Sequence, residues 1–100
     1  TSVIIPNSIE LYGNYPNPFN PSTTIKFAIP ENGNVNISIY NTVGEEVKSL
    51  NLPNRNAGEL SYTIDASTLS SGVYFYKISL SNSASGKHYN SSVSKMILLK

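Results

Sequence analysis

Apolar and polar residues alternate along most of this chain, with a period of two residues. In Thr23–Pro30 the apolar side chains occupy every second position, and similar alternation recurs in Val35–Tyr40 and Glu59–Asp65. Alternation over four to eight residues predicts strands with one buried face, and no stretch of useful length shows a helical period. The residues predicted to form one core between two sheets are Ile25, Phe27, Ile29, Val35, Ile37, Ile39, Tyr62, Ile64, Tyr74, Tyr76 and Ile78.

Turn-forming residues separate the predicted strands at intervals of about 8–12 residues. Pro30–Gly33 contains an Asn-Gly pair, which predicts a tight hairpin because both residues readily take positive φ. Asn41–Glu45 predicts a second turn, Pro53–Gly58 a loop, and Ala66–Ser71 a helical turn or crossover. This spacing predicts an all-β, immunoglobulin-like β-sandwich of about seven antiparallel strands.

The remaining strands are less regular. A short first strand over Ile9–Leu11 is expected to end at Gly13, and Glu46–Leu52 is expected to bury Val47 and, on the same reasoning, Leu50. The first eight residues are expected to be a linker, and residues 9–100 the folded domain. Because the chain starts at Thr1 rather than methionine and has no signal peptide, we expect it to be part of a longer precursor.

Two late stretches are apolar on both strand faces. Gly72–Ser81 is the more apolar, which indicates a central strand. Its Tyr74, two residues after Gly72, suits a tyrosine corner, with an ordinary core tyrosine as the alternative. The final stretch contains Met96, Ile97, Leu98 and Leu99 at consecutive positions. They are either enclosed by neighbouring strands or form an exposed patch or edge for a partner.

The most distinctive stretch is Asn14–Phe27, which holds three prolines, Pro16, Pro18 and Pro21. Proline fixes φ and favours extended geometry in the residue before it, and Asn17 and Asn20 each precede a proline. We expect a stiff segment outside the sheets that presents Tyr15 and Phe19 and then enters a strand.

Composition and charge exclude several classes of function. The chain is 39% hydrophobic and 13% charged, with a formal net charge of +1 and scattered lysines. No basic stripe exists to neutralise phosphates, so nucleic-acid binding is not supported. Cysteine is absent, which excludes disulfides and thiolate metal sites, and no apolar run is long enough to span a bilayer. No cofactor or metal is expected.

Candidate catalytic residues are few. His88 is the single histidine, and a triad with Asp65 and a serine lacks the usual nucleophile motif; His88 is interpreted as a surface residue and Asp65 as a cap of the turn after it. Glu45 and Glu46 are adjacent and would point to opposite strand faces. A sugar-stacking platform is the other alternative, and its candidate residues are Tyr15, Phe19, Tyr40 and Tyr89.

Four stretches together resemble one known family, the type A C-terminal sorting domains of the bacterial type IX secretion system. They are Tyr15–Pro21, Ile39–Val47, Leu69–Ile78 and Ser94–Lys100, and the resemblance covers roughly Ile9–Lys100. The structural motif residues within them are Pro16, Asn17, Pro18, Phe19, Pro21, Gly72 and Tyr74.

The resemblance implies a non-catalytic secretion signal for a passenger joined upstream. It implies recognition by the outer-membrane translocon, its shuttle proteins and a sortase-like peptidase, with export through the periplasm to the cell surface or medium. The residues expected to contact these partners are Lys95, Met96, Ile97, Leu98, Leu99 and Lys100. A structural or adhesive spacer, similar to the sandwich of some flagellar-hook scaffolding proteins, and a carbohydrate-binding module are the competing interpretations.

Overall fold

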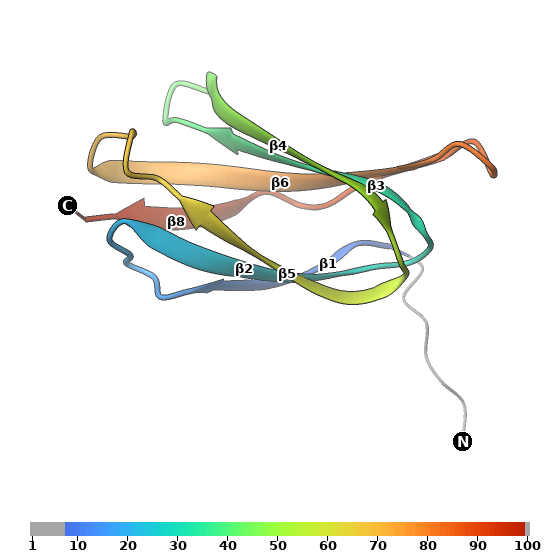
Figure 1. The fold of residues 1–100 in the computed structure, drawn as a ribbon. Coiled ribbons are helices and arrows are strands. Elements are labelled where there is room, and N and C mark those ends of the chain that lie inside the picture. Colours follow the sequence, from blue (N-terminus) through green and yellow to red (C-terminus); the bar gives the residue numbers. More distant parts are fainter. Residues whose placement is uncertain (1–7, 100) are drawn as a thin grey trace.

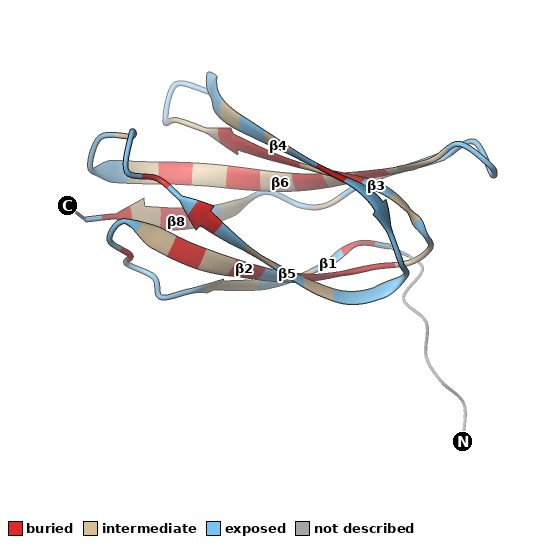
Figure 2. Cartoon of the chain, viewed as in Figure 1, coloured by how far each residue is buried: buried red, intermediate tan, exposed pale blue. Residues whose placement is uncertain are grey.

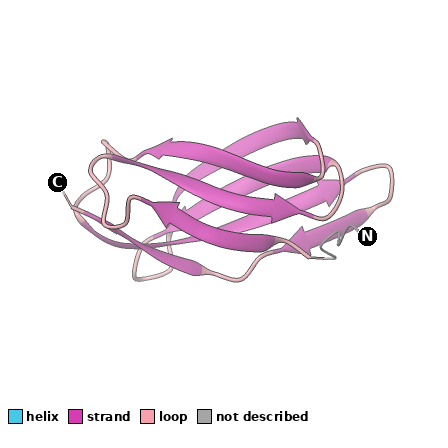
Figure 3. Cartoon of the chain, turned by 90° about the horizontal axis from the view of Figure 1, so that it is seen from below, coloured by secondary structure: helices cyan, strands magenta, loops and turns pink. Residues whose placement is uncertain are grey.

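The computed structural model describes residues 8–99. They form eight strands in two antiparallel sheets that pack face to face, and no helix occurs in this part of the chain (Figures 1 and 3). The predicted immunoglobulin-like sandwich is therefore confirmed. The strands are β1 (Glu10–Tyr15), β2 (Ser22–Ile29), β3 (Gly33–Tyr40), β4 (Glu46–Arg55), β5 (Gly58–Asp65), β6 (Gly72–Asn82), β7 (Lys87–Asn90) and β8 (Ser94–Leu98).

The smaller sheet has the strand order β1-β2-β5, and the larger sheet has the order β4-β3-β6 with both β7 and β8 paired to β6. β8 pairs with the first part of β6 and β7 with its last part, so β6 is the central strand that the sequence predicted. The residues after the loop at 83–86 form two strands, β7 and β8, because the pairing of β7 with β6 ends after Asn90. At Ser91 the side-chain hydroxyl, not the backbone carbonyl, accepts the bond from β6. The Ile78 N–H donates to the Ser91 hydroxyl at 2.8 Å, and the Ser91 N–H donates to the Ile78 carbonyl at 2.8 Å.

The predicted hairpin at Pro30–Gly33 is wrong, because the chain crosses from one sheet to the other there. β2 pairs with β1 and β5, whereas β3 pairs with β4 and β6. Gly33 lies outside the positive-φ region. It is needed for close approach instead, since a Cβ at this position would lie 2.5 Å from the Ser81 carbonyl oxygen.

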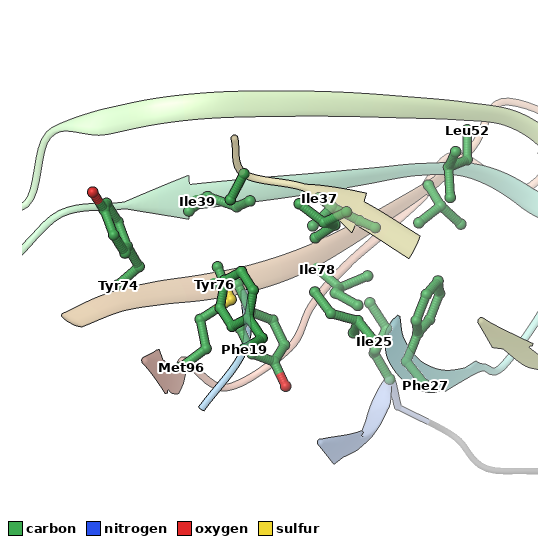
Figure 4. Close-up of a cluster of buried hydrophobic side chains, with 14 of the residues drawn as sticks. Phe19, Ile25, Phe27, Ile37, Ile39, Leu52, Tyr74, Tyr76, Ile78 and Met96 are labelled. Atoms are coloured by element: carbon green, nitrogen blue, oxygen red, sulfur yellow. The ribbon is translucent and has the colours of Figure 1, made fainter. Parts of the chain in front are cut away.

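The core lies between the sheets (Figures 2 and 4), and the predicted core residues are buried except for Tyr62. Tyr62 is partly exposed because β5 is an edge strand, although it packs against the core. The core also contains side chains from outside the predicted set: Ile9, Phe19, Leu52, Ala66, Leu80, Met96 and Leu98.

Two expectations about strand limits and one about burial are wrong. β1 continues through Gly13, where a bulge absorbs the irregularity. Val47 is exposed because the register between β3 and β4 shifts beside it. The buried residue of β4 is Leu52, which pairs with Val35. β4 runs through Pro53 to Arg55 rather than ending in a loop, which an edge strand tolerates because no neighbour needs the missing N–H.

The chain enters and leaves the sandwich at opposite ends. Glu10 in β1 pairs with Ala28 near the end of β2, and Leu98 in β8 pairs with Gly72 at the start of β6. β2 and β6 begin at the same end of the molecule (Figure 1). The start of β1 and the end of β8 therefore lie at opposite ends of a body measuring 43 × 29 × 20 Å.

Candidate functional site

The four stretches that carry the family resemblance meet at one end of the sandwich. This end, called here the β8 end, comprises the proline segment (residues 14–21), the turn at residues 41–45, the crossover at residues 66–71 and the end of β8. The turn follows Tyr40, which pairs with Phe75 near the start of β6, and the crossover leads directly into β6. In Figure 1 these segments lie at the end where β8 terminates.

The proline segment covers the outer edge of β8. The Phe19 N–H donates to the Ile97 carbonyl at 2.9 Å, and the Leu99 N–H donates to the Phe19 carbonyl at 2.9 Å. The Asn17 Oδ1 accepts the Ile97 N–H at 3.0 Å. The sequence suggested that this edge of β8 could be open to a partner. Three of its backbone groups are instead paired within the chain: the N–H and carbonyl of Ile97 and the N–H of Leu99.

Phe19 is the anchor of this segment. It is only 2% exposed and packs in the core near Tyr76 and Met96 (Figure 4), so the expectation that it is presented to solvent is wrong. Tyr15 is 83% exposed, as expected. A residue between prolines in a polar stretch gives no alternation from which its burial can be predicted.

Carbonyl groups of two prolines fix the rest of the segment. The buried Thr23 hydroxyl donates to the Pro16 carbonyl at 2.8 Å, and the Ala66 N–H donates to the Pro21 carbonyl at 2.9 Å. The peptide bonds that precede Pro16, Pro18 and Pro21 are cis. The segment thus joins β2, the crossover and β8 into one surface.

The crossover contains the predicted tyrosine corner. The Tyr74 hydroxyl donates to the Ser70 carbonyl at 2.6 Å, four residues upstream, which confirms the corner over an ordinary core tyrosine. The Ser67 N–H donates to Asp65 Oδ1 at 2.9 Å, as the capping interpretation predicted. Hydrogen bonds from the Ser67 backbone and side chain lower the pKa of Asp65.

The turn at residues 41–45 is closed by two backbone hydrogen bonds, from the Asn41 N–H to the Glu45 carbonyl and from the Gly44 N–H to the Asn41 carbonyl, and by the Asn41 side chain. Asn41 Oδ1 accepts the N–H groups of Val43 and Glu45 at 3.1 and 2.9 Å, and Gly44 takes a positive φ of 86°. The Asn41 amide also donates to the Glu45 carboxylate at 3.1 Å. Glu45 therefore stabilises the turn, and Val43 at its tip is exposed.

The predicted partner-contacting residues divide into two groups. Met96 and Leu98 are fully buried in the core, so they cannot contact a partner in the folded domain. Lys95 and Leu99 are exposed and Ile97 is partly exposed, because alternate residues of a strand face opposite sides. Lys100 lies outside the described residues.

The other candidate chemistries are not assembled by the fold. Asp65 pairs with Ser22 in the smaller sheet, whereas His88 pairs with Ser81 at the far end of the larger sheet, so they do not form a triad. The sugar-stacking platform fails because Phe19 is buried and the Tyr89 hydroxyl donates to Glu31 at 2.6 Å. Residues 8–99 contain no group of three His, Cys, Asp or Glu side chains suited to a metal.

The described residues include no helix long and apolar enough to cross a membrane. Sequence reasoning missed the hydrogen bonds that Asn17 makes to Ile97, Thr23 to Pro16 and Ser91 to Ile78. The only sequence signal for any of them was Asn17 before a proline, a feature typical of a local turn rather than of a bond to a residue 80 positions away.

Two solved structures share the fold. The chain superimposes with a TM-score of 0.76 and 22% identity on dimeric latent PorU from Porphyromonas gingivalis, covering 99% of this chain and 10% of that one. It also superimposes on FlgD from Xanthomonas campestris, a protein of hook capping in flagellar assembly, with a TM-score of 0.65 and 21% identity over 90% of this chain and 67% of that one. These identities establish the fold alone. No curated protein sequence matches the chain.

The family is established by the sequence itself. The sequence profile of the family described as "Secretion system C-terminal sorting domain" matches residues 14–95, a span that starts in the proline segment and ends in β8. Three of the four stretches meeting at the β8 end fall within it, and the match confirms the resemblance to type IX sorting domains. This β-sandwich belongs to the secretion system C-terminal sorting domain family, whose members act as secretion signals and are generally not catalytic.

Proposed function

We propose that this domain sends a passenger protein, joined upstream of residues 9–100, through the outer-membrane translocon of a type IX secretion system. Residues 1–8 serve as the linker, and the domain itself performs no catalysis. Shuttle proteins and a sortase-like peptidase are the further partners, and the destination is the cell surface or the medium.

One observation carries this proposal: the motif stretches converge on the β8 end, opposite the start of β1. A signal that follows many passengers must be read without interference from them. Attachment at one end and recognition at the other meet that requirement, whereas a spacer has no need to gather its distinctive residues at a single end.

The test is a periplasm-directed fluorescent reporter with the full 100-residue chain at its C-terminus, expressed in a bacterium with a compatible type IX system. We expect the reporter at the surface or in the medium, and in the periplasm of an isogenic strain without the translocon. The mass of the exported reporter reports whether the domain is removed by a peptidase.

A matched fusion separates the signal from the spacer. In it, the same chain stands between the reporter and a second folded domain. A C-terminal signal should lose export in this position, whereas a spacer should behave alike in both. Retention of the terminal fusion in the periplasm despite correct folding would overturn the proposal.

A further inference from the structure

The outward face of the larger sheet is apolar near the β8 end and polar toward the other end. Along β6 and β8, partly exposed or exposed residues alternate with buried ones (Figure 2). In β3 the outward Asn34, Asn36 and Tyr40 are exposed or partly exposed, while the outward Ser38 is buried. Near the β8 end the outward side chains are Tyr40, Val73, Phe75, Ile97 and Leu99, called here the outer patch. Toward the other end they are Asn34, Asn36, Ser79, Ser81, His88 and Asn90.

The strand register makes the outer patch continuous. Tyr40 pairs with Phe75 across β3 and β6, and Val73 pairs with Ile97 across β6 and β8. Residues directly opposite one another have Cβ atoms about 4.5–5.5 Å apart. Leu99, which is 54% exposed, extends the patch toward the end of the chain.

The outer patch is not part of the hydrophobic core. The core is built from the inward residues of the same strands, and the polar half of the same face shows that Asn and Ser suffice at outward positions. The sandwich has only two layers, and no described strand covers this face (Figures 1 and 3). Contiguous apolar residues on an uncovered face are typical of interaction sites.

Charged residues flank the patch on two sides. On the β4 side the exposed Glu46 pairs with Tyr40, and two lysines lie on the β6 and β8 side. Lys77 follows Phe75 by two residues in β6 and Lys95 pairs with Phe75 from β8, so both point outward beside it. Neither forms a hydrogen bond or ion pair through its side chain with another residue in 8–99. A fitting partner therefore presents carboxylates on the β8 side of an apolar centre.

We propose that the outer patch docks a protein of the secretion apparatus through an apolar surface bordered by carboxylates that face Lys77 and Lys95. This inference rests on the proposed function and names the surface that carries it. An apolar centre with a charged rim is the usual anatomy of a specific interface. The lysines select the partner and set its orientation, while the aromatic and aliphatic side chains supply the buried area.

The test uses the same terminal reporter fusion with paired substitutions on this face. The double variant Phe75→Thr/Ile97→Thr retains β-branched residues in the strands but removes the apolar patch. Its matched control, Asn36→Thr/Ser79→Thr, also places one threonine on each of two neighbouring strands, but in the polar half of the same face. We expect the patch variant to lower export about tenfold, as loss of interface anchors does, and the control to export as the unsubstituted chain does.

Charge reversal tests the partner's chemistry. Lys77→Glu/Lys95→Glu should lower export by a similar factor, and Lys77→Arg/Lys95→Arg should retain it. Circular dichroism and urea unfolding of the purified full chain must show each variant folded. A folded patch variant exported like the unsubstituted chain overturns this inference while leaving the proposed function intact; failure of the unsubstituted fusion overturns the proposed function instead.

A lipid surface is the competing occupant, and it gives a different result. Purified chain is mixed with vesicles of zwitterionic lipid or with vesicles containing anionic lipid. We expect no binding to either. Binding to anionic vesicles that is lost in Phe75→Thr/Ile97→Thr would show that the patch meets a membrane, and the inference of a protein partner would be wrong.

Discussion

Two tyrosines two residues apart in β6 place their hydroxyl groups in opposite situations. The Tyr74 hydroxyl donates to the Ser70 carbonyl at 2.6 Å. The Tyr76 hydroxyl is fully buried and has no hydrogen-bond partner with good geometry among the described residues, although Ser94 lies close to it. Burial raises the pKa of Tyr76, and the nearby Ser94 hydroxyl partly opposes that increase.

Removing the two hydroxyl groups should therefore have opposite effects. Tyr74→Phe should lower the free energy of unfolding by about 1 kcal/mol, because the hydrogen bond to the Ser70 carbonyl is lost. Tyr76→Phe should leave the free energy of unfolding unchanged or raise it, since an unpaired buried hydroxyl carries a desolvation cost. Urea unfolding of both variants measures this, with Tyr15→Phe as an exposed control. A loss of stability in Tyr76→Phe equal to that in Tyr74→Phe would contradict the assignment.

At the scale of the element, β8 depends on a segment that lies almost 80 residues earlier in the sequence. Its outer edge is covered by Asn17 and Phe19 rather than by another strand. An uncovered edge is a site for unwanted pairing with other chains. The proline segment therefore protects β8 and, through the buried Phe19 side chain, couples it to the core.

Hydrogen exchange can separate the two contacts of this cover. Asn17→Ala removes the acceptor of the Ile97 N–H, so that amide should exchange roughly three- to tenfold faster, as expected for a net hydrogen bond of about 0.5–1.5 kcal/mol. The Leu99 amide, which donates to the Phe19 carbonyl, should keep its protection and serves as the internal control. Unchanged exchange at Ile97 would show that the Asn17 contact does not close the edge.

A second pair of elements is joined by one carboxylate. Glu31 lies in the link between β2 and β3 (residues 30–32). Its carboxylate accepts hydrogen bonds from the Tyr89 hydroxyl at 2.6 Å and the Ser85 hydroxyl at 2.8 Å. The bond from Tyr89 and then that from Ser85 lower the pKa of Glu31, while the carboxylate raises the pKa of Tyr89. The bonds from Tyr89 and Ser85, which join residues 30–32 to the β6–β7 hairpin, are therefore strongest while Glu31 is ionised.

These bonds predict a pH dependence of stability. A carboxyl group whose pKa is lowered by folding stabilises the domain above its unfolded-state pKa, about 4.3 for Glu, and this contribution is lost as pH falls through the lower folded-state pKa. Glu31→Gln should therefore show a smaller loss of stability than the unsubstituted chain between about pH 5 and pH 3. Tyr89→Phe should reduce the loss in the same range. If the urea midpoint changed with pH in the same way in all three proteins, the hydrogen bonds to Glu31 would not contribute to the pH dependence of stability.

The sequence predicted the faces of the strands better than it predicted their neighbours. Alternation identifies which side of a strand is buried, and that is why Ile25, Ile37 and Ile78 are in the core as expected. It does not identify which strand lies alongside. The Asn-Gly pair at 32–33 therefore looked like a hairpin, although the chain changes sheets there and Gly33 serves close packing against Ser81.

The candidate site was predicted in its parts rather than in its arrangement. Tyr74 could be assigned because its partner, Ser70, is close in sequence. The contact of Phe19 with Ile97 joins distant stretches, and no local pattern specifies such a pair. The two apolar faces of Gly72–Ser81 predicted a central strand, but only the register of β3, β6 and β8 shows that Val73 and Phe75 belong to one outward patch.

At the scale of the whole molecule, the two ends of the sandwich differ in kind. The β8 end gathers the motif stretches and most of the exposed large hydrophobic residues: Tyr15, Val43, Val47 and Leu99. The opposite end is formed by the crossover at residues 30–32, the link at residues 56–57 and the loop at residues 83–86, and its surface hollow is lined by Asn32, Asn34, Asn54, Arg55, Asn56 and Asn82 with neighbouring small residues. We infer that recognition belongs to the first end and that the second tolerates variation.

Insertions into matched loops test this division. An eight-residue Gly/Ser segment inserted between Ala84 and Ser85 lengthens a surface loop at the far end, and the same segment between Thr42 and Val43 lengthens the exposed turn at the β8 end. Each lies in a short loop between antiparallel strands, so the cost of loop closure should be similar and small. We expect the first insertion to leave export of the terminal reporter fusion unchanged and the second to reduce it severalfold.

The comparison requires that both inserted proteins remain folded. The turn at 41–45 contains the bonds made by Asn41, and the loop at 83–86 contains comparable bonds from its N–H groups to Asn82 Oδ1 at 2.8 and 3.1 Å. Because the Ser85 hydroxyl also donates to Glu31, the urea midpoint should fall at least as far in the 84–85 variant as in the 42–43 variant. A greater loss of export in the 42–43 variant would then arise from the surface that its insertion covers rather than from lower stability. Equal export of both variants, or greater loss from the 84–85 insertion, would place recognition away from the β8 end.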